Sequence, residues 1–288
     1  MARGNVRPTI VPWLDLDCEG MFPVFPDLRF LAEGDSWFTV SGFPAYNLLF
    51  ELRFWKQALI VNCGMPGDTI RNMSEISKNR NLREALTAGD LRWDAILLSG
   101  GGNDLIDVAD EIILPEVAWT HLQGRTIADY CHAAKLDALL RDVQLGYRRI
   151  AASRESAGPA ARRVPMLAHT YDYVTPRNAP ARFVVVTLGP WLYKAFTHHG
   201  VPRSDWVALA DYLIDRLAEC ILALEHGADP ILGFHVVDTR GTLRRSDPGS
   251  VGDNHDWQNE IHPNGGGYEK LARRIEEALS RLVGEPDR

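Results

Sequence analysis

The chain has 288 residues, of which 45% are hydrophobic, so it can bury a substantial core as one large domain or two small ones. Its formal net charge is −7, and lysine and arginine are scattered along the chain, which excludes an electrostatic site for nucleic acid or an anionic membrane. The four cysteines, Cys18, Cys63, Cys131 and Cys220, are too widely spaced for a zinc knuckle or a disulfide framework, so we expect reduced thiols. No apolar stretch is long enough for a signal-peptide core or a membrane span, which predicts a soluble, cytoplasmic protein.

The predicted elements alternate between strands and helices along most of the chain. Residues 1–27 are interrupted by prolines and are expected to form an irregular segment packed on a single domain that covers 28–288. Short runs rich in Ile, Val, Leu and Phe predict strands at 28–32, 58–62, 95–99, 164–169 and 231–237. Apolar residues at helical spacing predict four helices: one opened by Pro44 that carries Tyr46, Leu49, Phe50 and Phe54, one over 136–150, one capped by Ser204 that runs to 221, and one over 268–282. This alternation is typical of a doubly wound parallel sheet, here of about five strands.

Two connections are too long to be simple crossovers, so we expect insertions at about 105–127 and about 171–203. Both follow strands and leave the same edge of the sheet. The second insertion could form a lid or pocket wall for an acyl or aryl group wider than acetyl, or its aromatic residues could give it a small core of its own. The aromatic residues are Tyr171, Tyr173, Phe183, Trp191, Tyr193 and Phe196.

Polar residues follow the first three of the expected strands and precede the last helix. Ser36 comes directly after a Gly-Asp turn, and Gly67 opens a second turn in which Asp68 or Thr69 can cap the next helix. Asn103 follows three glycines, and His262 precedes the final helix. Because the carboxyl ends of parallel strands meet at one edge of a sheet, these residues are expected to lie close together. A serine, a base and amide donors in one place are what acyl transfer requires.

In these blocks the sequence resembles the SGNH hydrolases, also called GDSL-type esterases and lipases. Ser36 in Gly-Asp-Ser matches the nucleophile of that family, and His262, followed by proline, matches its general base. Gly67 in Gly-Asp-Thr and Asn103 in Gly-Gly-Asn-Asp match its oxyanion donors. The blocks occur in the family's order and bracket residues 34–263, which is nearly the whole expected domain.

The resemblance implies a three-layer α/β/α, flavodoxin-like sandwich that hydrolyses a carboxylic ester or thioester without a metal or a cofactor. His262 would take the proton of Ser36 as that oxygen attacks the acyl carbon. The main-chain N–H groups of Ser36 and Gly67 and the side-chain amide of Asn103 would hold the oxyanion. A small-molecule ester is the expected partner, and no oligomeric state is implied.

One position departs from the family's pattern. An aspartate usually lies three residues before the histidine, and Asn259 occupies that position here. An amide oxygen can accept the imidazole N–H but supplies no charge, so a less basic histidine or a weaker catalyst is expected. The other candidate partners for the histidine are a main-chain carbonyl and the neighbouring carboxylates, which are Asp253, Asp256 and Glu260.

Two other functions stay open on the sequence alone. A metal-dependent hydrolase could use the loop that holds Asp253, His255, Asp256, Glu260 and His262, although their spacing matches no zinc helix motif. A weakly catalytic binding protein of the same fold is permitted by the missing aspartate.

Several residues near these blocks are assigned supporting roles. Trp37, Tyr171, Asp172 and Trp191 are candidate substrate contacts, although the 169–172 run could equally be a hydrogen-bonded loop anchor. Asp35 and Asp104 are expected to hold their turns by hydrogen bonds to the main chain, and Trp257 is expected to pack in the core.

Overall fold

The computed structural model of the protein describes residues 4–15, 26–39, 46–88, 91–159, 161–182 and 187–284. Cys18, Pro44 and Phe183, which the sequence singles out, lie outside these ranges. Within the described ranges, no helix combines the length and the apolar character needed to cross a bilayer. Cys63, Cys131 and Cys220 are buried free thiols, as expected.

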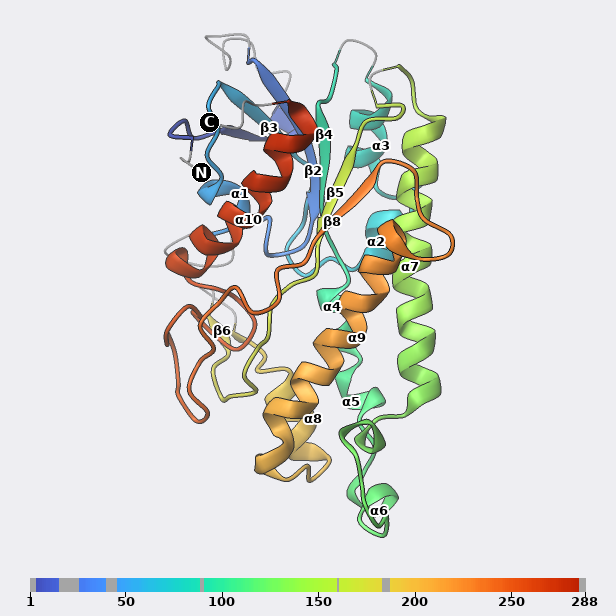
Figure 1. Cartoon of the computed structure of the whole chain (residues 1–288), viewed down its shortest axis with the longest axis vertical. Helices are drawn as coiled ribbons and strands as arrows, with labels where there is room; N and C mark the ends of the chain where they lie inside the picture. The colour runs from blue at the N-terminus through green and yellow to red at the C-terminus, as the bar shows by residue number, and fades with distance from the viewer. Residues whose placement is uncertain are drawn as a thin grey trace.

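A sheet of six parallel strands forms the centre of the molecule, in the order β1-β3-β2-β4-β5-β8 (Figure 1). The strands are β1 (Thr9–Pro12), β2 (Leu28–Gly34), β3 (Ala58–Asn62), β4 (Ala95–Ser99), β5 (Met166–His169) and β8 (Phe234–Val237). The expected bounds of β3 and β4 are confirmed, β2 continues two residues further, and β5 and β8 begin later than expected. In the four inner strands, the runs of Ile, Val, Leu and Phe are buried because helices cover both faces of the sheet.

The edge strand β1 differs from two predictions. It lies in the segment predicted to be irregular, and it gives the sheet six strands where about five were predicted. It pairs in parallel with β3, with Val11 opposite Val61. Pro8 precedes its short apolar run and Pro12 ends it, so the run is too short to predict a strand. An edge strand tolerates proline because only one of its sides is hydrogen-bonded within the sheet.

Helices cover both faces of the sheet and complete the three-layer α/β/α sandwich. In Figure 1, α1 and α10 lie on one side of the sheet, and α2, α3, α7 and α9 lie on the other. The covering helices are α1 (Leu48–Glu51), α2 (Ile70–Ser74), α3 (Arg80–Thr87), α7 (Ala133–Ser156), α9 (Trp206–His226) and α10 (Gly265–Val283). The fold class predicted from the sequence is confirmed.

Two helix beginnings differ in detail from the prediction. Ser204 does not cap α9: it lies in a 3-10 turn, η3 (Arg203–Asp205), and the helix begins at Trp206 with Asp205 at the N-cap position. The first predicted helix is short, because α1 begins after Asn47, whose side chain accepts the N–H of Phe50.

Both expected insertions leave the end of the sheet and form a separate group of short elements there (Figure 1). The first holds the end of α4 (Gly102–Asp107), α5 (Ala109–Ile112) and α6 (Glu116–Trp119), and a 3-10 turn, η2 (Ile127–Tyr130), follows. The second holds the hairpin of β6 (Ala181–Arg182) and β7 (Thr187–Leu188), then α8 (Leu192–His198) and η3. The rings of Tyr193 and Phe196 pack against Trp206 of α9, so part of the aromatic cluster forms a local core.

Candidate active site

The serine lies in a tight turn that requires a glycine before it. A Cβ on Gly34 would come within 2.8 Å of the Ser99 Cβ, so only glycine lets β2 end this close to β4. The turn is closed by the Asp35 N–H, which donates to the Ser99 carbonyl at 3.1 Å, and by the Trp37 N–H, which donates to Asp35 Oδ1 at 2.9 Å. Asp35 therefore holds the turn as expected, and Ser36 lies at the carboxyl end of the sheet.

The hydroxyl of Ser36 meets the imidazole of His262. The distance from Ser36 Oγ to His262 Nε2 is 2.7 Å, and both side chains are buried. His262 lies in the loop between β8 and α10, 226 residues further along the chain. The indole N–H of Trp37 donates to the carbonyl of Ile261 at 3.2 Å, so the residue after the serine holds the residue before the histidine.

The side chain of Asn259 orients the imidazole. Its Oδ1 lies 3.1 Å from His262 Nδ1 and accepts the main-chain N–H groups of Ile261 at 3.1 Å and His262 at 2.9 Å. Two main-chain donors at this atom identify it as the amide oxygen, so Nδ1 must carry the ring proton. Nε2 then presents its lone pair to Ser36, which is the tautomer that a general base requires.

Burial keeps the imidazole neutral. Loss of hydration lowers the pKa of His262 to about 4, because an imidazolium at this position would have little contact with water. At neutral pH the ring is therefore ready to accept a proton.

The carboxylates near His262 bind other groups. Asp253 accepts from Asn264, Asp256 accepts the N–H of Arg244 and the ammonium of Lys270, and Glu260 accepts the N–H of Tyr193. Among the described residues, none of these three carboxylates hydrogen-bonds to His262.

The proposed metal loop is not supported by these positions. Within the part of the chain that the structure describes, the acidic and histidine side chains of residues 253–262 do not converge on one point, and His255 instead pairs with Asp247 at 3.0 Å. The contacts of these residues organise the loop, which is the simpler role for them.

Asn103 lines the same cavity as Ser36, and the turn that contains Gly67 follows the neighbouring strand β3 at the same end of the sheet. Asn103 is the second residue of α4, and its Nδ2 donates to the Asp68 carbonyl at 2.8 Å, which fixes it to the turn that contains Gly67. An amide nitrogen has two hydrogens, so one remains for a ligand. Gly67 has φ +76°, and a Cβ there would meet no atom within 4 Å, so its main chain is open to a ligand. Within the described residues, no hydrogen bond occupies the N–H of Ser36 or of Gly67.

The turn after β3 is held as the sequence suggests. Thr69, rather than Asp68, caps α2, because its Oγ1 accepts the Asn72 N–H at 3.3 Å. Asp104 Oδ2 accepts the Ile70 N–H at 2.8 Å, so it joins α4 to α2.

A mostly apolar cavity opens beside Ser36. Of the four candidate substrate contacts, Trp37, Tyr171 and Asp172 line it, while the ring of Trp191 stands edge-on to His262 with the centroids 6.3 Å apart. Asp172 also anchors a loop, because it accepts the N–H groups of Gly241 and Leu243 at 2.7 Å. The apolar lining consists of Leu105, Ile106, Val174, Leu192, Ile214 and Ile261.

A buried hydrogen-bond network lies under the serine, and no local sequence pattern indicates it. Asp35 Oδ2 accepts the hydroxyl of Tyr171 at 2.5 Å, and Asp35 Oδ1 accepts the hydroxyl of Ser99 at 2.9 Å. His169 Nε2 lies 3.0 Å from Ser99 Oγ. Burial raises the pKa of Asp35 to about 6 despite these donors. The positive φ of Tyr171, +65°, turns its chain at the end of β5, and nothing in the local sequence predicts that conformation.

Comparison with solved structures shows a shared fold. A possible lipase from Chitinophaga pinensis DSM 2588 is 13% identical and has a TM-score of 0.50, over 90% of this chain and 100% of that one. A carbohydrate acetylesterase family member from Sinorhizobium meliloti is 14% identical, with a TM-score of 0.47 over 89% and 99% of the two chains. The aryl esterase of M. smegmatis is 15% identical, with a TM-score of 0.44 over 88% and 99%. The sequence matches no protein-family model and no curated protein.

Proposed function

We propose that the chain is a serine ester hydrolase of the SGNH type, which forms an acyl-enzyme on Ser36. The observation that carries the proposal is the 2.7 Å contact between Ser36 Oγ and Nε2 of His262. The four sequence blocks that resemble the SGNH hydrolases support it, and the fold shared with a possible lipase is compatible with it.

Acylation would begin with proton transfer from the Ser36 hydroxyl to His262 Nε2 as Oγ attacks the acyl carbon. The carbonyl oxygen would become an oxyanion and accept hydrogen bonds from the N–H groups of Ser36 and Gly67 and from Asn103 Nδ2. Collapse would break the bond to the alcohol, which would leave with the proton held on Nε2. Water would then attack the acyl-enzyme by the same route and release the acid.

Asn259 would orient the base without stabilising its charge. Its Oδ1 accepts the Nδ1 proton, so the ring keeps the correct tautomer through the cycle. The imidazolium that forms after proton transfer would meet an amide dipole instead of a carboxylate. A lower turnover than that of an aspartate-containing site is therefore expected.

The cavity favours a short acyl group. Its volume is about 40 Å³, room for roughly three water-sized groups. Leu192 of α8 and Ile214 of α9 form part of its apolar wall. We expect kcat/KM to be highest for acetyl and propionyl esters in a panel of acyl lengths.

The test of the proposal is turnover and covalent labelling of Ser36. Wild-type protein should hydrolyse p-nitrophenyl acetate in the presence of a chelator and should be labelled by a fluorophosphonate. Ser36→Ala should lose both, by at least about a thousandfold in kcat. Ser77→Ala, which changes an exposed serine, should behave as wild type. Wild-type protein without turnover or labelling would instead indicate a binding protein of this fold.

A further inference from the structure

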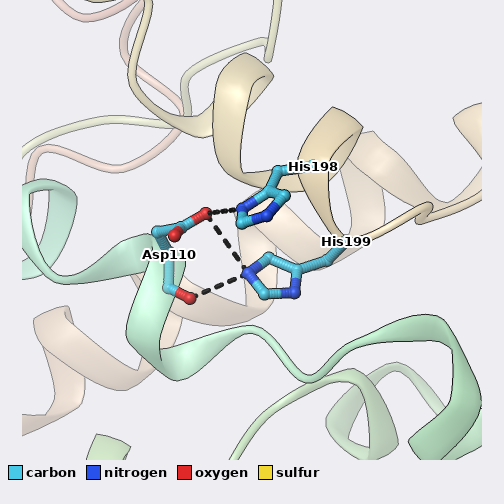
Figure 2. Close-up of side chains that lie close together, drawn as sticks. All are labelled: Asp110, His198 and His199. Carbon is cyan, nitrogen blue, oxygen red and sulfur yellow. Dashed lines mark hydrogen bonds and ion pairs between the residues drawn. The ribbon is translucent and has the colours of Figure 1, made fainter.

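Two histidines and an aspartate meet where α5 of the first insertion contacts α8 of the second (Figure 2). His198 Nδ1 lies 2.7 Å from Asp110 Oδ1, and His199 Nε2 lies 3.2 Å from the same oxygen. Asp110 belongs to α5, His198 ends α8, and His199 follows it. The three ligand-type atoms all lie within 4.8 Å of one another, so two separate segments present one cluster.

One of these spacings, that of His199 from Asp110, is close to the spacing of neighbouring ligands around a tetrahedral metal ion. Metal–nitrogen and metal–oxygen bonds of about 2.0–2.1 Å separate neighbouring ligand atoms by roughly 3.3 Å. His199 Nε2 already lies at that distance from Asp110 Oδ1. His198 Nδ1 is closer to the same oxygen and would have to move slightly away from it to make room for the ion. An ion pair at the end of α8 would need one histidine, whereas here two imidazoles face one carboxylate oxygen.

We propose that Asp110, His198 and His199 bind one divalent transition-metal ion, with zinc as the expected occupant. Two imidazole nitrogens and a carboxylate oxygen suit zinc, and a fourth position would remain for water. Binding would place the ring protons on His198 Nε2 and His199 Nδ1, so that the facing nitrogens carry lone pairs. It would replace the present hydrogen bond of 2.8 Å from His199 Nε2 to the Asp110 carbonyl.

The position of the site assigns it a structural role. α5 follows α4, which carries Asn103, and α8 begins at Leu192, which lines the cavity. At a rise of about 1.5 Å per residue, His198 lies roughly 9 Å along α8 from Leu192. A bound ion would therefore join the two insertions beyond the cavity, and hydrolysis at Ser36 would not pass through it.

Calorimetric titration with zinc, on protein freed of any histidine tag and of bound metal, tests the proposal. Wild-type protein should bind one zinc ion. Loss of a residue that only hydrogen-bonds to a metal ligand weakens metal affinity by roughly 10- to 100-fold. His198→Ala and Asp110→Asn each remove a ligand, so each should weaken zinc binding by more than that. His121→Ala changes an exposed histidine outside the cluster and should bind as wild type does. Absence of stoichiometric binding, or equal affinity in all four proteins, would overturn the site.

Thermal unfolding provides a second readout that separates folding defects from metal binding. Zinc should raise the unfolding midpoint of wild type and of His121→Ala, but not of the two cluster variants, because only binding to the folded state stabilises it. The same midpoints in chelator show whether each variant is folded. If zinc leaves every midpoint unchanged, the cluster is an ion pair and the proposal fails. Hydrolysis of p-nitrophenyl acetate should persist in chelator, so the two proposals are tested separately.

Discussion

At the scale of single residues, the central feature is a general base with a neutral partner. Burial lowers the pKa of His262 to about 4, and the amide of Asn259 adds no negative charge to raise it. The ring is thus neutral over a wide pH range, which favours activity in mildly acidic solution. It is also a weak base, which limits the rate of proton transfer.

Asn259→Asp should make the base stronger. A carboxylate at 3.1 Å from Nδ1 would favour the imidazolium, so the pKa of His262 would rise. Since the neutral ring is the active form, the acid limb of kcat/KM should move to higher pH, while kcat at neutral pH should increase by about tenfold or more. Asn259→Ala, which removes the acceptor, should lower kcat instead. Identical pH profiles for wild type and Asn259→Asp would contradict the role of Asn259.

Asn103→Ala should remove one oxyanion donor. We expect kcat to fall by about 100- to 1000-fold, with KM little changed, because the lost hydrogen bond would be strongest in the transition state. The contact of Asn103 with the Asp68 carbonyl is also lost, so unfolding curves must show that the variant is folded. A folded variant with full turnover would exclude Asn103 from the oxyanion hole.

At the scale of elements, α8 is a cavity wall held at its beginning by a buried carboxylate. Glu260, next to Asn259, accepts the main-chain N–H groups of Trp191 and Tyr193. It also accepts the N–H of Arg177 at 3.3 Å. Burial raises the pKa of Glu260 to about 7, so the carboxylate that holds the wall titrates near neutral pH.

Glu260→Gln tests this attachment through KM. Below about pH 7, Glu260 of the wild type becomes protonated, and one of its oxygens can no longer accept a main-chain N–H at the start of α8. Because α8 forms a wall of the cavity, substrate binding should weaken and KM should rise as the pH falls. The pKa of His262, about 4, lies well below this window, so the general base itself does not change its protonation there. Glu260→Gln should show a raised KM that no longer depends on pH, whereas the exposed control Glu277→Gln should follow wild type. A pH-dependent KM in Glu260→Gln would show that another group titrates.

The elements that the sequence could predict are those with a long, unbroken pattern. β3 and β4 are continuous apolar runs, and α7 and α10 contain the predicted periodic segments. β1 was missed because its pattern is too short between prolines. The prediction that Ser204 caps α9 is wrong, because Asp205 occupies the N-cap position. A serine is recognised as a capping residue from its type alone, whereas the actual start of the helix depends on the 3-10 turn that precedes it.

At the scale of the whole molecule, buried acids without a facing cation reduce stability at high pH. Burial raises the pKa of Glu33 to about 8 and that of Asp104 to about 6. The carboxyl group of Glu33 has only neutral donors among the described residues, which are Asn79 Nδ2 at 3.0 Å and the Gly34 N–H at 3.1 Å. Ionising Glu33 therefore costs more in the folded state than in water.

Glu33→Gln should remove much of this pH dependence. The folded protein binds the Glu33 proton up to about pH 8, whereas the unfolded chain loses it above its ordinary value of 4.5, so the free energy of unfolding falls as the pH rises between them. The slope from this one group is at most about 1.4 kcal/mol per pH unit. Denaturant unfolding should show a flatter pH profile for Glu33→Gln, and the exposed control Glu219→Gln should match wild type. Parallel profiles for Glu33→Gln and wild type would contradict the buried acid.

The candidate site was predictable where its chemistry lies in short blocks. Ser36, Gly67, Asn103 and His262 each follow a glycine turn or precede a helix, so the sequence alone predicts that they lie at one end of the sheet. Contacts between distant side chains carry no such signal. Tyr171 and Asp35 are 136 residues apart. The residues next to Tyr171 in the sequence do not indicate that the Tyr171 hydroxyl donates to Asp35.

The edge strand β1 also prevents β3 from pairing with other molecules. β1 covers the free side of β3, whose Leu59, Ile60 and Val61 are almost completely buried. A fragment or variant that lost Thr9–Pro12 would present a row of unpaired N–H and C=O groups beside an apolar strand. Such an edge is a template for pairing with another copy, so the loss of β1 should promote self-association of the sheet.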